Sequence, residues 1–387
     1  MIDVKSFFGR INDLDTHIQP SPLTYEIAAG ELGRQFGNMY KELLAKLPPE
    51  EAAKIAARST DEVNVYNDDT VWKIKGSAAP GSFTPGGRIK TLDYMGVNRS
   101  MIISDIGIQG EAFSKNTLSL PTMRHWNDFA INYSKTNRDR LRMVAILNTH
   151  DIDVATAEAE RVLKAGGNAF VLASSVPPGG LSPAHEKMDK LWGMIQEANA
   201  TAILHLGGEG GFLGSDAWSK GIKHLGVQET DVTAEGDQMD TFTFSWMHMS
   251  AQNFISAMVL GGVFEKFPHL RFAAVELGAH WFGPMAKHLD TVAHIFRRRI
   301  DTSLSMKPSE YIRRNIRVTP YYFEPVAEFI EHHGMDECYC YSSDFPHPEG
   351  GARPLQEFTQ RIERLGQVNA EKFFVTNSDW VLPKVAA

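Results

Sequence analysis

Eight short apolar runs, alternating with helical segments, are the feature that most restricts what this chain can fold into. Each run is unbroken rather than alternating in polarity, which is typical of parallel strands whose outer side is covered. Eight strand–helix units favour an α/β fold of the (β/α)8 TIM-barrel type over a doubly wound sheet. The first run also lacks the glycine-rich phosphate fingerprint of a doubly wound fold. The runs lie at 11–18, 99–105, 142–148, 168–173, 202–206, 271–276, 316–322 and 338–343.

The 387 residues suffice for one barrel domain that spans 1–387. Between the first and second runs lies a polar region, 20–87, that proline and glycine interrupt. We predict that this region is an insertion after the first strand and acts as a lid over the functional site.

Composition restricts the partners. The net charge of −8 and the absence of a lysine- or arginine-rich block exclude nucleic acid as the main partner. No apolar run spans a bilayer, and the first residues lack a signal-peptide core. Cys338 and Cys340 are too close in sequence for an easy disulfide, so we expect reduced thiols in a cytoplasmic protein. The expected partners are a small-molecule substrate and either further copies of the chain or a paralogous subunit.

Metal-capable side chains stand where four of the predicted strands end, which is the catalytic face of this barrel. Asp15 and His17 end the first run, with Asp13 on the same face. His205 ends the fifth run, Glu276 ends the sixth, and Asp344 follows the eighth. Crowded carboxylates and imidazoles without a cation would repel one another or stay unsatisfied. The sequence therefore predicts that Asp15, His17, His205 and Asp344 bind a divalent Zn, Mn or Fe ion, one ion rather than two.

Three further residues are candidates for catalysis. Glu276 ends the sixth run and is predicted to act as a general base or as a further ligand. His280 lies just beyond it, and His248 begins a predicted helix. Glu276 and His280 would be additional ligands if two ions were bound. The structural alternative for His280 is a ring that bonds a backbone carbonyl while Trp281 caps the barrel.

Five residues are candidates for binding the substrate. His150 follows the third strand, His347 follows Asp344 closely, and Arg353 is placed to orient a substrate carboxylate, with an exposed surface position as the alternative. Trp218 and Trp246 would line an apolar pocket, or belong to the ordinary core.

These motifs, in their order and spacing, resemble the amidohydrolase-related proteins grouped as "amidohydrolase 2", which include the aminocarboxymuconate semialdehyde decarboxylase-like barrel proteins. The segments that carry the resemblance include DLDTHIQP, GGVFEKFPHLRFAAVELGAHW and YSSDFPHPEGG. The resemblance implies a TIM barrel with a mononuclear metal at the strand ends. Asp15 stands where the decarboxylases have the first histidine of His-x-His, and Glu276 stands where they have a catalytic histidine. Decarboxylase chemistry therefore cannot simply be carried over, and the more anionic site favours Mn or Fe(II).

The sequence thus predicts a metal-dependent hydrolase or a non-oxidative decarboxylase, a carbon–carbon lyase, that acts on a small organic acid or cyclic compound. The alternative enzyme is a dinuclear non-haem iron or manganese monooxygenase on the same barrel. The alternative without activity of its own is a metal-binding subunit of a larger complex.

Overall fold

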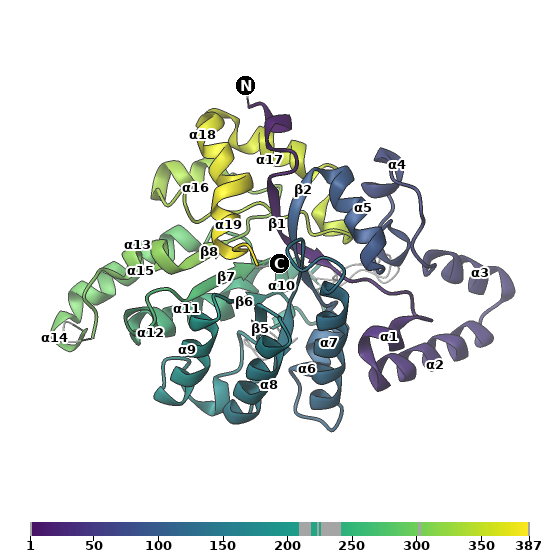
Figure 1. The fold of residues 1–387 in the computed structure, drawn as a ribbon, viewed down its shortest axis with the longest axis horizontal. Helices are drawn as coiled ribbons and strands as arrows, with labels where there is room; N and C mark the ends of the chain where they lie inside the picture. Colours follow the sequence, from purple (N-terminus) through teal and green to yellow (C-terminus); the bar gives the residue numbers. More distant parts are fainter. Residues whose placement is uncertain (1, 209–217, 223, 226–240, 301–302, 386–387) are drawn as a thin grey trace.

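The fold is a closed parallel barrel surrounded by helices (Figure 1). The computed structural model describes residues 2–208, 218–222, 224–225, 241–300 and 303–385. Its parallel strands form two hydrogen-bonded sheets, β1-β2-β3 and β4-β5-β6-β7-β8. They are β1 (Ile11–His17), β2 (Val97–Ile103), β3 (Leu141–Met143), β4 (Ala145–Leu147), β5 (Ala169–Leu172), β6 (Thr201–His205), β7 (Arg271–Val275) and β8 (Ile316–Val318).

Two features join these sheets into one barrel. Only Val144 separates β3 from β4, and its backbone N–H donates to Ile102 at 2.9 Å, so β3 and β4 are one barrel strand. On the other side, the extended segment 338–345 lies between β8 and β1. It pairs through Tyr339 with Val318 and through Phe345 with Thr16. This segment is the eighth strand, and the predicted (β/α)8 barrel is confirmed.

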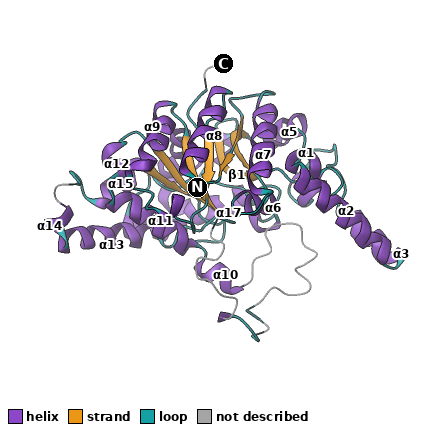
Figure 2. Ribbon diagram, turned by 90° about the horizontal axis from the view of Figure 1, so that it is seen from below, coloured by secondary structure: helices purple, strands orange, loops and turns teal. Residues whose placement is uncertain are grey.

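The region 20–87, which the sequence predicts to be an insertion, lies between β1 and β2. Its helices α2 and α3 project away from the barrel in two perpendicular views (Figures 1 and 2). The amphipathic α2 begins after Gly30, and α3 begins with Pro49 in the first turn, where no N–H is needed. The helices of the region 20–87 are α1 (Tyr25–Ala29), α2 (Glu31–Lys46), α3 (Pro49–Arg58) and α4 (Asp68–Val71), and α5 (Pro85–Met95) begins at its end. Whether they act as a lid stays a prediction.

Most of the remaining helices surround the barrel (Figure 2). Local signals fix several of them: Asp151 caps the start of α8, and Asp105 caps the start of α6. These helices are α6 (Ile106–Ala112), α7 (Ser119–Ser134), α8 (Ile152–Lys164), α9 (Asp189–Glu197), α10 (Thr241–Trp246), α11 (His248–Leu260), α12 (Val263–Lys266), α13 (Phe282–Ile295), α14 (Arg297–Ile300), α15 (Pro308–Asn315), α16 (Val326–His333), α17 (Pro354–Ile362), α18 (Gly366–Glu371) and α19 (Asn377–Val381).

One helix is longer than its sequence pattern indicates. The pattern predicts a helix near 127–135, but α7 already begins at Ser119. Pro121 lies in its first turn, where its missing N–H costs no hydrogen bond, so the proline does not delay the start. Among the described helices, none combines the length and the apolar character that a membrane crossing needs.

Candidate metal centre

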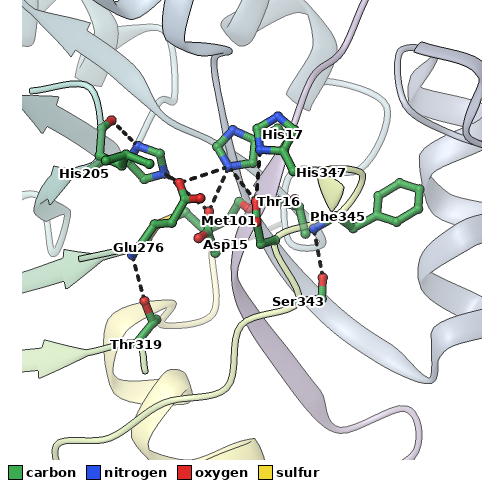
Figure 3. Close-up of polar contacts among 12 residues, drawn as sticks. Asp15, Thr16, His17, Met101, His205, Glu276, Thr319, Ser343, Phe345 and His347 are labelled. Atoms are coloured by element: carbon green, nitrogen blue, oxygen red, sulfur yellow. Dashed lines mark hydrogen bonds and ion pairs between the residues drawn. The ribbon is translucent and has the colours of Figure 1, made fainter. Parts of the chain in front are cut away.

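Five side chains from four barrel strands converge at the carboxyl ends of the strands. Figure 3 labels four of them, Asp15, His17, His205 and Glu276. Asp15 and His17 end β1, His205 ends β6, Glu276 follows β7, and Asp344 belongs to the segment 338–345. All five are at most 5% exposed. Parallel strands in a barrel bring their carboxyl ends to one face, so residues far apart in sequence meet there.

The two imidazoles lie among the carboxylates at the spacing of metal ligands. His17 Nε2 is 3.1 Å from Asp15 Oδ1, 3.4 Å from Asp344 Oδ1 and 3.8 Å from Glu276 Oε2. His205 Nε2 is 3.1 Å from Glu276 Oε2 and 3.4 Å from Asp15 Oδ1. One ligand atom each from Asp15, His17, His205 and Glu276 fall within 4.8 Å of one another. Ligands about 2.1 Å from one ion are separated by about 3 to 3.5 Å. Four of these five separations fall in that range, and the fifth is 3.8 Å.

Backbone carbonyls orient both rings. His17 Nδ1 lies 3.2 Å from the carbonyl oxygen of Ser104, and His205 Nδ1 lies 2.7 Å from that of Leu206. A carbonyl oxygen only accepts, so each Nδ1 carries the proton and donates. The Nε2 atom of each ring therefore faces the carboxylates, which is the arrangement that outer partners impose on metal-binding histidines.

Several buried atoms at the centre of this group make no hydrogen bond of acceptable geometry with a described residue. They are Asp15 Oδ1, His17 Nε2, His205 Nε2 and both carboxylate oxygens of Asp344. Burial alone would raise the pKa of Asp344, but His347 and His17 outweigh it and hold that pKa below its usual value. Burial likewise opposes the charged form of His17, yet Asp15 and Asp344 raise its pKa well above normal. The buried carboxylates therefore need a compensating positive charge beside them. A bound divalent cation would supply that charge.

Two members of the group have left-handed backbone conformations. Glu276 has φ of +57° and Asp344 has φ of +51°, a region that residues with a Cβ rarely adopt. Hydrogen bonds hold Glu276 there: its N–H donates to Thr319 Oγ1 at 2.9 Å, and the Tyr321 hydroxyl donates to its carbonyl at 2.8 Å. Such conformations cost about 1–3 kcal/mol each and are concentrated at functional sites. The sequence carried no signal for them.

Asp13, predicted on the same face as Asp15, lies outside the groups with ligand geometry. Its Oδ1 accepts from the backbone N–H of Asp15 at 3.1 Å and of Ser343 at 2.9 Å. Burial raises the pKa of Asp13 to about 7. Its carboxyl group therefore joins the first and last strands of the barrel.

His347, predicted to bind substrate, lies against the candidate ligands, and its binding role stays a prediction. Its Nδ1 is 3.0 Å from Asp344 Oδ1, its ring stacks on His17 with centroids 4.0 Å apart, and its Nε2 is 3.3 Å from Gln19 Oε1. His17, Asp344 and His347 form a second group with ligand geometry. The spacing of Asp344 and His347 across a tight turn is the only sequence signal for this contact.

His280 and His248 lie together but outside both groups. Their rings are in edge contact with centroids 4.5 Å apart, and His280 Nδ1 is 3.3 Å from Glu324 Oε1. Burial, and then the charge of His280, lower the pKa of His248 to about 4. Glu324, which also accepts from the N–H of Ala279, was not among the predicted residues. The partner of the His280 ring is thus a carboxylate rather than the backbone carbonyl of the structural alternative, and its catalytic role stays a prediction.

The other predicted substrate residues are dispersed. His150 Nε2 lies 2.9 Å from the carbonyl oxygen of Phe113, Trp218 is 69% exposed, Trp246 is half-buried, and Arg353 is exposed before α17. Their binding roles stay predictions. Most of the glycine-rich run 207–211 that follows His205 lies outside the described residues.

The barrel and the buried carboxylate–imidazole cluster at its strand ends define a metal-dependent (β/α)8-barrel enzyme. The sequence model of the family described as Amidohydrolase matches residues 91–383. The chain belongs to this amidohydrolase family, as the motifs indicated. No curated protein sequence matches the chain.

Solved structures share the fold at low identity. An amidohydrolase from Mycobacterium avium subsp. paratuberculosis K-10 is 16% identical, with a TM-score of 0.68, over 96% of this chain and 99% of that one. A 5-carboxyvanillate decarboxylase from Sphingomonas paucimobilis is 15% identical, with a TM-score of 0.58, over 97% and 99%. A dihydroxybenzoic acid decarboxylase from Polaromonas sp. JS666, solved with bound manganese, is 15% identical, with a TM-score of 0.60, over 96% of each chain.

These findings confirm the predicted class: a metal-dependent enzyme, a hydrolase or a lyase, with a divalent metal cofactor. They give no support to the monooxygenase alternative.

Proposed function

We propose that the protein is a metal-dependent, non-oxidative decarboxylase of a small aromatic acid, with hydrolysis as the second candidate. The observation that carries the proposal is the buried convergence of Asp15, His17, His205, Glu276 and Asp344. Support for decarboxylation comes from the similar barrels that act on 5-carboxyvanillate and dihydroxybenzoic acid.

Asp15, His17, His205 and Asp344 are the residues that would hold the ion. Two of these four are carboxylates and Glu276 adds a third nearby, so hard oxygen donors favour Mn²⁺ or Fe²⁺ over Zn²⁺. When bound, the ion would supply Lewis-acid polarisation of a substrate oxygen.

Glu276 is the residue proposed to move the proton. In decarboxylation, the bond between the ring carbon and the carboxylate carbon breaks, and its electron pair stays on the ring. CO2 leaves, and the ring carbon takes a proton, which the Glu276 carboxyl group is placed to donate. Glu276 contacts His205 from the neighbouring strand, so its position is fixed relative to the ligands.

One observation supports hydrolysis as the second candidate. A cavity of about 10 Å³, roughly the size that one water molecule needs, is lined by Asp15, Glu276 and Asp344, among others. A carboxylate at Glu276 would take a proton from such a water as it attacks a carbonyl carbon.

The test is turnover by the full chain, stripped of metal and reloaded with Mn²⁺. We expect CO2 release from a hydroxylated benzoate, and a loss of about 10²- to 10⁴-fold in kcat for Glu276→Gln. His269→Ala, an exposed histidine outside the ligand groups, is the control. Hydrolysis of aryl esters or lactones without CO2 release would select the second candidate. The proposal would be refuted if the reloaded protein showed no metal-dependent turnover of either kind.

We also propose that the chain is cytoplasmic and forms an oligomer with copies of itself or with a paralogous subunit. Exposed apolar side chains on and before the insertion helices support association, as Leu23, Ile27 and Met39 are 61%, 55% and 67% exposed. The two buried free thiols, Cys338 and Cys340, support a reducing compartment. Light scattering of the purified chain tests self-association: a monomer at micromolar concentration would exclude the homo-oligomer.

A further inference from the structure

Aromatic side chains that follow β8 reach the candidate metal centre. Tyr321 and Tyr322 come shortly after that strand, and they line the cavity of about 10 Å³ together with Asp15, Glu276 and Asp344. Because such a cavity admits little more than one water molecule, only a small group of a ligand can enter it. The rest of the ligand must lie against the residues around the cavity, which include these two rings.

Four rings form one group, called here the aromatic cluster: Tyr321, Tyr322, Phe323 and Phe244. The Phe323 ring is parallel to that of Tyr321, with centroids 5.2 Å apart, and in edge contact with that of Tyr322 at 5.3 Å. Phe244, from α10, lies 5.3 Å from Tyr321 and 5.9 Å from Phe323. Tyr321 is buried, whereas Phe323 is 43% exposed and Phe244 is 37% exposed. The cluster thus extends from the cavity to the surface and leaves aromatic area that a flat ring would cover.

Contacts with neighbouring loops hold the two tyrosines in place. The Tyr321 hydroxyl donates to the carbonyl of Glu276 at 2.8 Å, and its backbone N–H donates to Glu324 Oε2 at 2.8 Å. The Tyr322 ring lies so close to Gly351 that a Cβ there would be 2.9 Å from Tyr322 Cε1. The cluster is therefore fixed relative to Glu276, and a ring that binds to it costs little further ordering.

The cavity beside the cluster is anionic. Carboxyl groups of Asp15, Glu276, Asp344 and Glu349 line it, and none of the described residues in its lining is basic. Like charges placed side by side are costly, so a carboxylate that enters the cavity needs a cation there. The rings carry no charge and accommodate the uncharged part of a ligand.

We propose that the aromatic cluster binds the ring of the substrate, so that its reacting carboxylate enters the cavity beside Glu276. The inference rests on the proposed decarboxylase function and names the surface that selects its substrate. In an aromatic acid one bond joins the ring to the carboxylate carbon. A carboxylate in the cavity therefore leaves the ring at its mouth, against Tyr321 and Tyr322. Aromatic acids are preferred over aliphatic acids of similar size, because contacts between rings are favourable beyond the area that they bury.

Calorimetry on the full, Mn²⁺-loaded chain compares benzoate with cyclohexanecarboxylate, which share a carboxylate and differ in the aromaticity of the ring. We expect the wild type to bind benzoate about 3- to 10-fold more tightly. Tyr322→Leu and Phe323→Leu each keep an apolar side chain but lose a ring, and each lowers this preference to less than about twofold. Tyr322→Phe keeps the ring and the preference. Phe296→Leu, at a 46% exposed ring after α13, is the control and also keeps it.

The same titration on the metal-free chain tests where the carboxylate lies. Benzoate affinity should fall by at least about tenfold without Mn²⁺, because carboxyl groups line the cavity. An unchanged affinity would place the carboxylate outside the cavity and overturn the proposal. A preference for benzoate that is the same in Tyr322→Leu, Phe323→Leu and the wild type would overturn it as well.

Turnover of hydroxylated benzoates separates this failure from that of the proposed function. Mn²⁺-dependent decarboxylation with an unaltered KM in both leucine variants would leave the function standing and overturn the role of the cluster. A preference that depends on Tyr322 and Phe323, without turnover of any aromatic acid, would refute the decarboxylase and retain the cluster as the site that binds aromatic acids.

Discussion

The carboxylate of Asp13 accepts a hydrogen bond from the backbone N–H of Ser343 at 2.9 Å, across a separation of 330 residues. Because Asp13 is on β1 and Ser343 is in the segment 338–345, this bond helps to close the barrel beside the candidate ligands. The same oxygen accepts from the N–H of Asp15, so it also fixes the strand at the metal site.

Asp13→Ala should therefore lower the free energy of unfolding by about 2–4 kcal/mol, because two buried N–H groups lose their acceptor. Asp13→Asn keeps an acceptor oxygen and should cost less than about 1.5 kcal/mol. Urea denaturation monitored by circular dichroism measures both values. Equal stability of Asp13→Ala and the wild type would show that this bond contributes nothing to closure.

Arg88 should position the candidate metal centre without touching the ion. It is fully buried, Nη2 donates to the carbonyl of His17, Nε donates to Gly81 at 2.6 Å, and the guanidinium lies 5.2 Å from the centroid of the Phe345 ring. A lysine cannot reproduce this planar set of contacts. Arg88→Lys should weaken Mn²⁺ affinity by about 10- to 100-fold, the usual effect of altering the support of a ligand.

Competition with a metal-sensitive dye measures that affinity. Arg34→Lys, at a 56% exposed side chain with surface ion pairs only, is the matched control and should bind Mn²⁺ as the wild type does. Wild-type affinity in Arg88→Lys would contradict the positioning role.

His248 should make stability depend on pH between about 6.5 and 4. Burial and the neighbouring His280 lower its pKa from 6.5 to about 4 in the folded chain. The unfolded chain therefore binds the extra proton first, and stability is complete above 6.5 and falls as the pH approaches 4. His248→Gln should flatten this part of the profile, as measured by thermal unfolding at pH 4.5 and 7. The same slope in both proteins would assign the dependence to other groups.

The strand-end ligands were predictable because a barrel brings the carboxyl ends of its strands to one face. Strand order alone predicted that Asp15, His17 and His205 lie close together and that Asp344 lies beside His17. The supporting geometry was not predictable. The left-handed backbone at Glu276 depends on contacts with residues 43 and 45 positions away, which no local pattern encodes.

The closure of the barrel was also only partly predictable from the sequence. An apolar run near 338–343 indicated the eighth strand, but its pairing with β1 depends on single contacts such as that between Phe345 and Thr16. The start of α7 was misplaced because Pro121 and polar neighbours mask the first turns of the helix. The pairing of His280 with Glu324 required the fold, since the two residues come from different loops.

The most direct test of the account is metal content. Elemental analysis should find one divalent ion per chain in the wild type and in His269→Ala, and less than a tenth of that in His205→Ala and Asp344→Ala, with circular dichroism unchanged. Undiminished metal in both His205→Ala and Asp344→Ala would contradict the claim that distant strand ends converge to hold a cation.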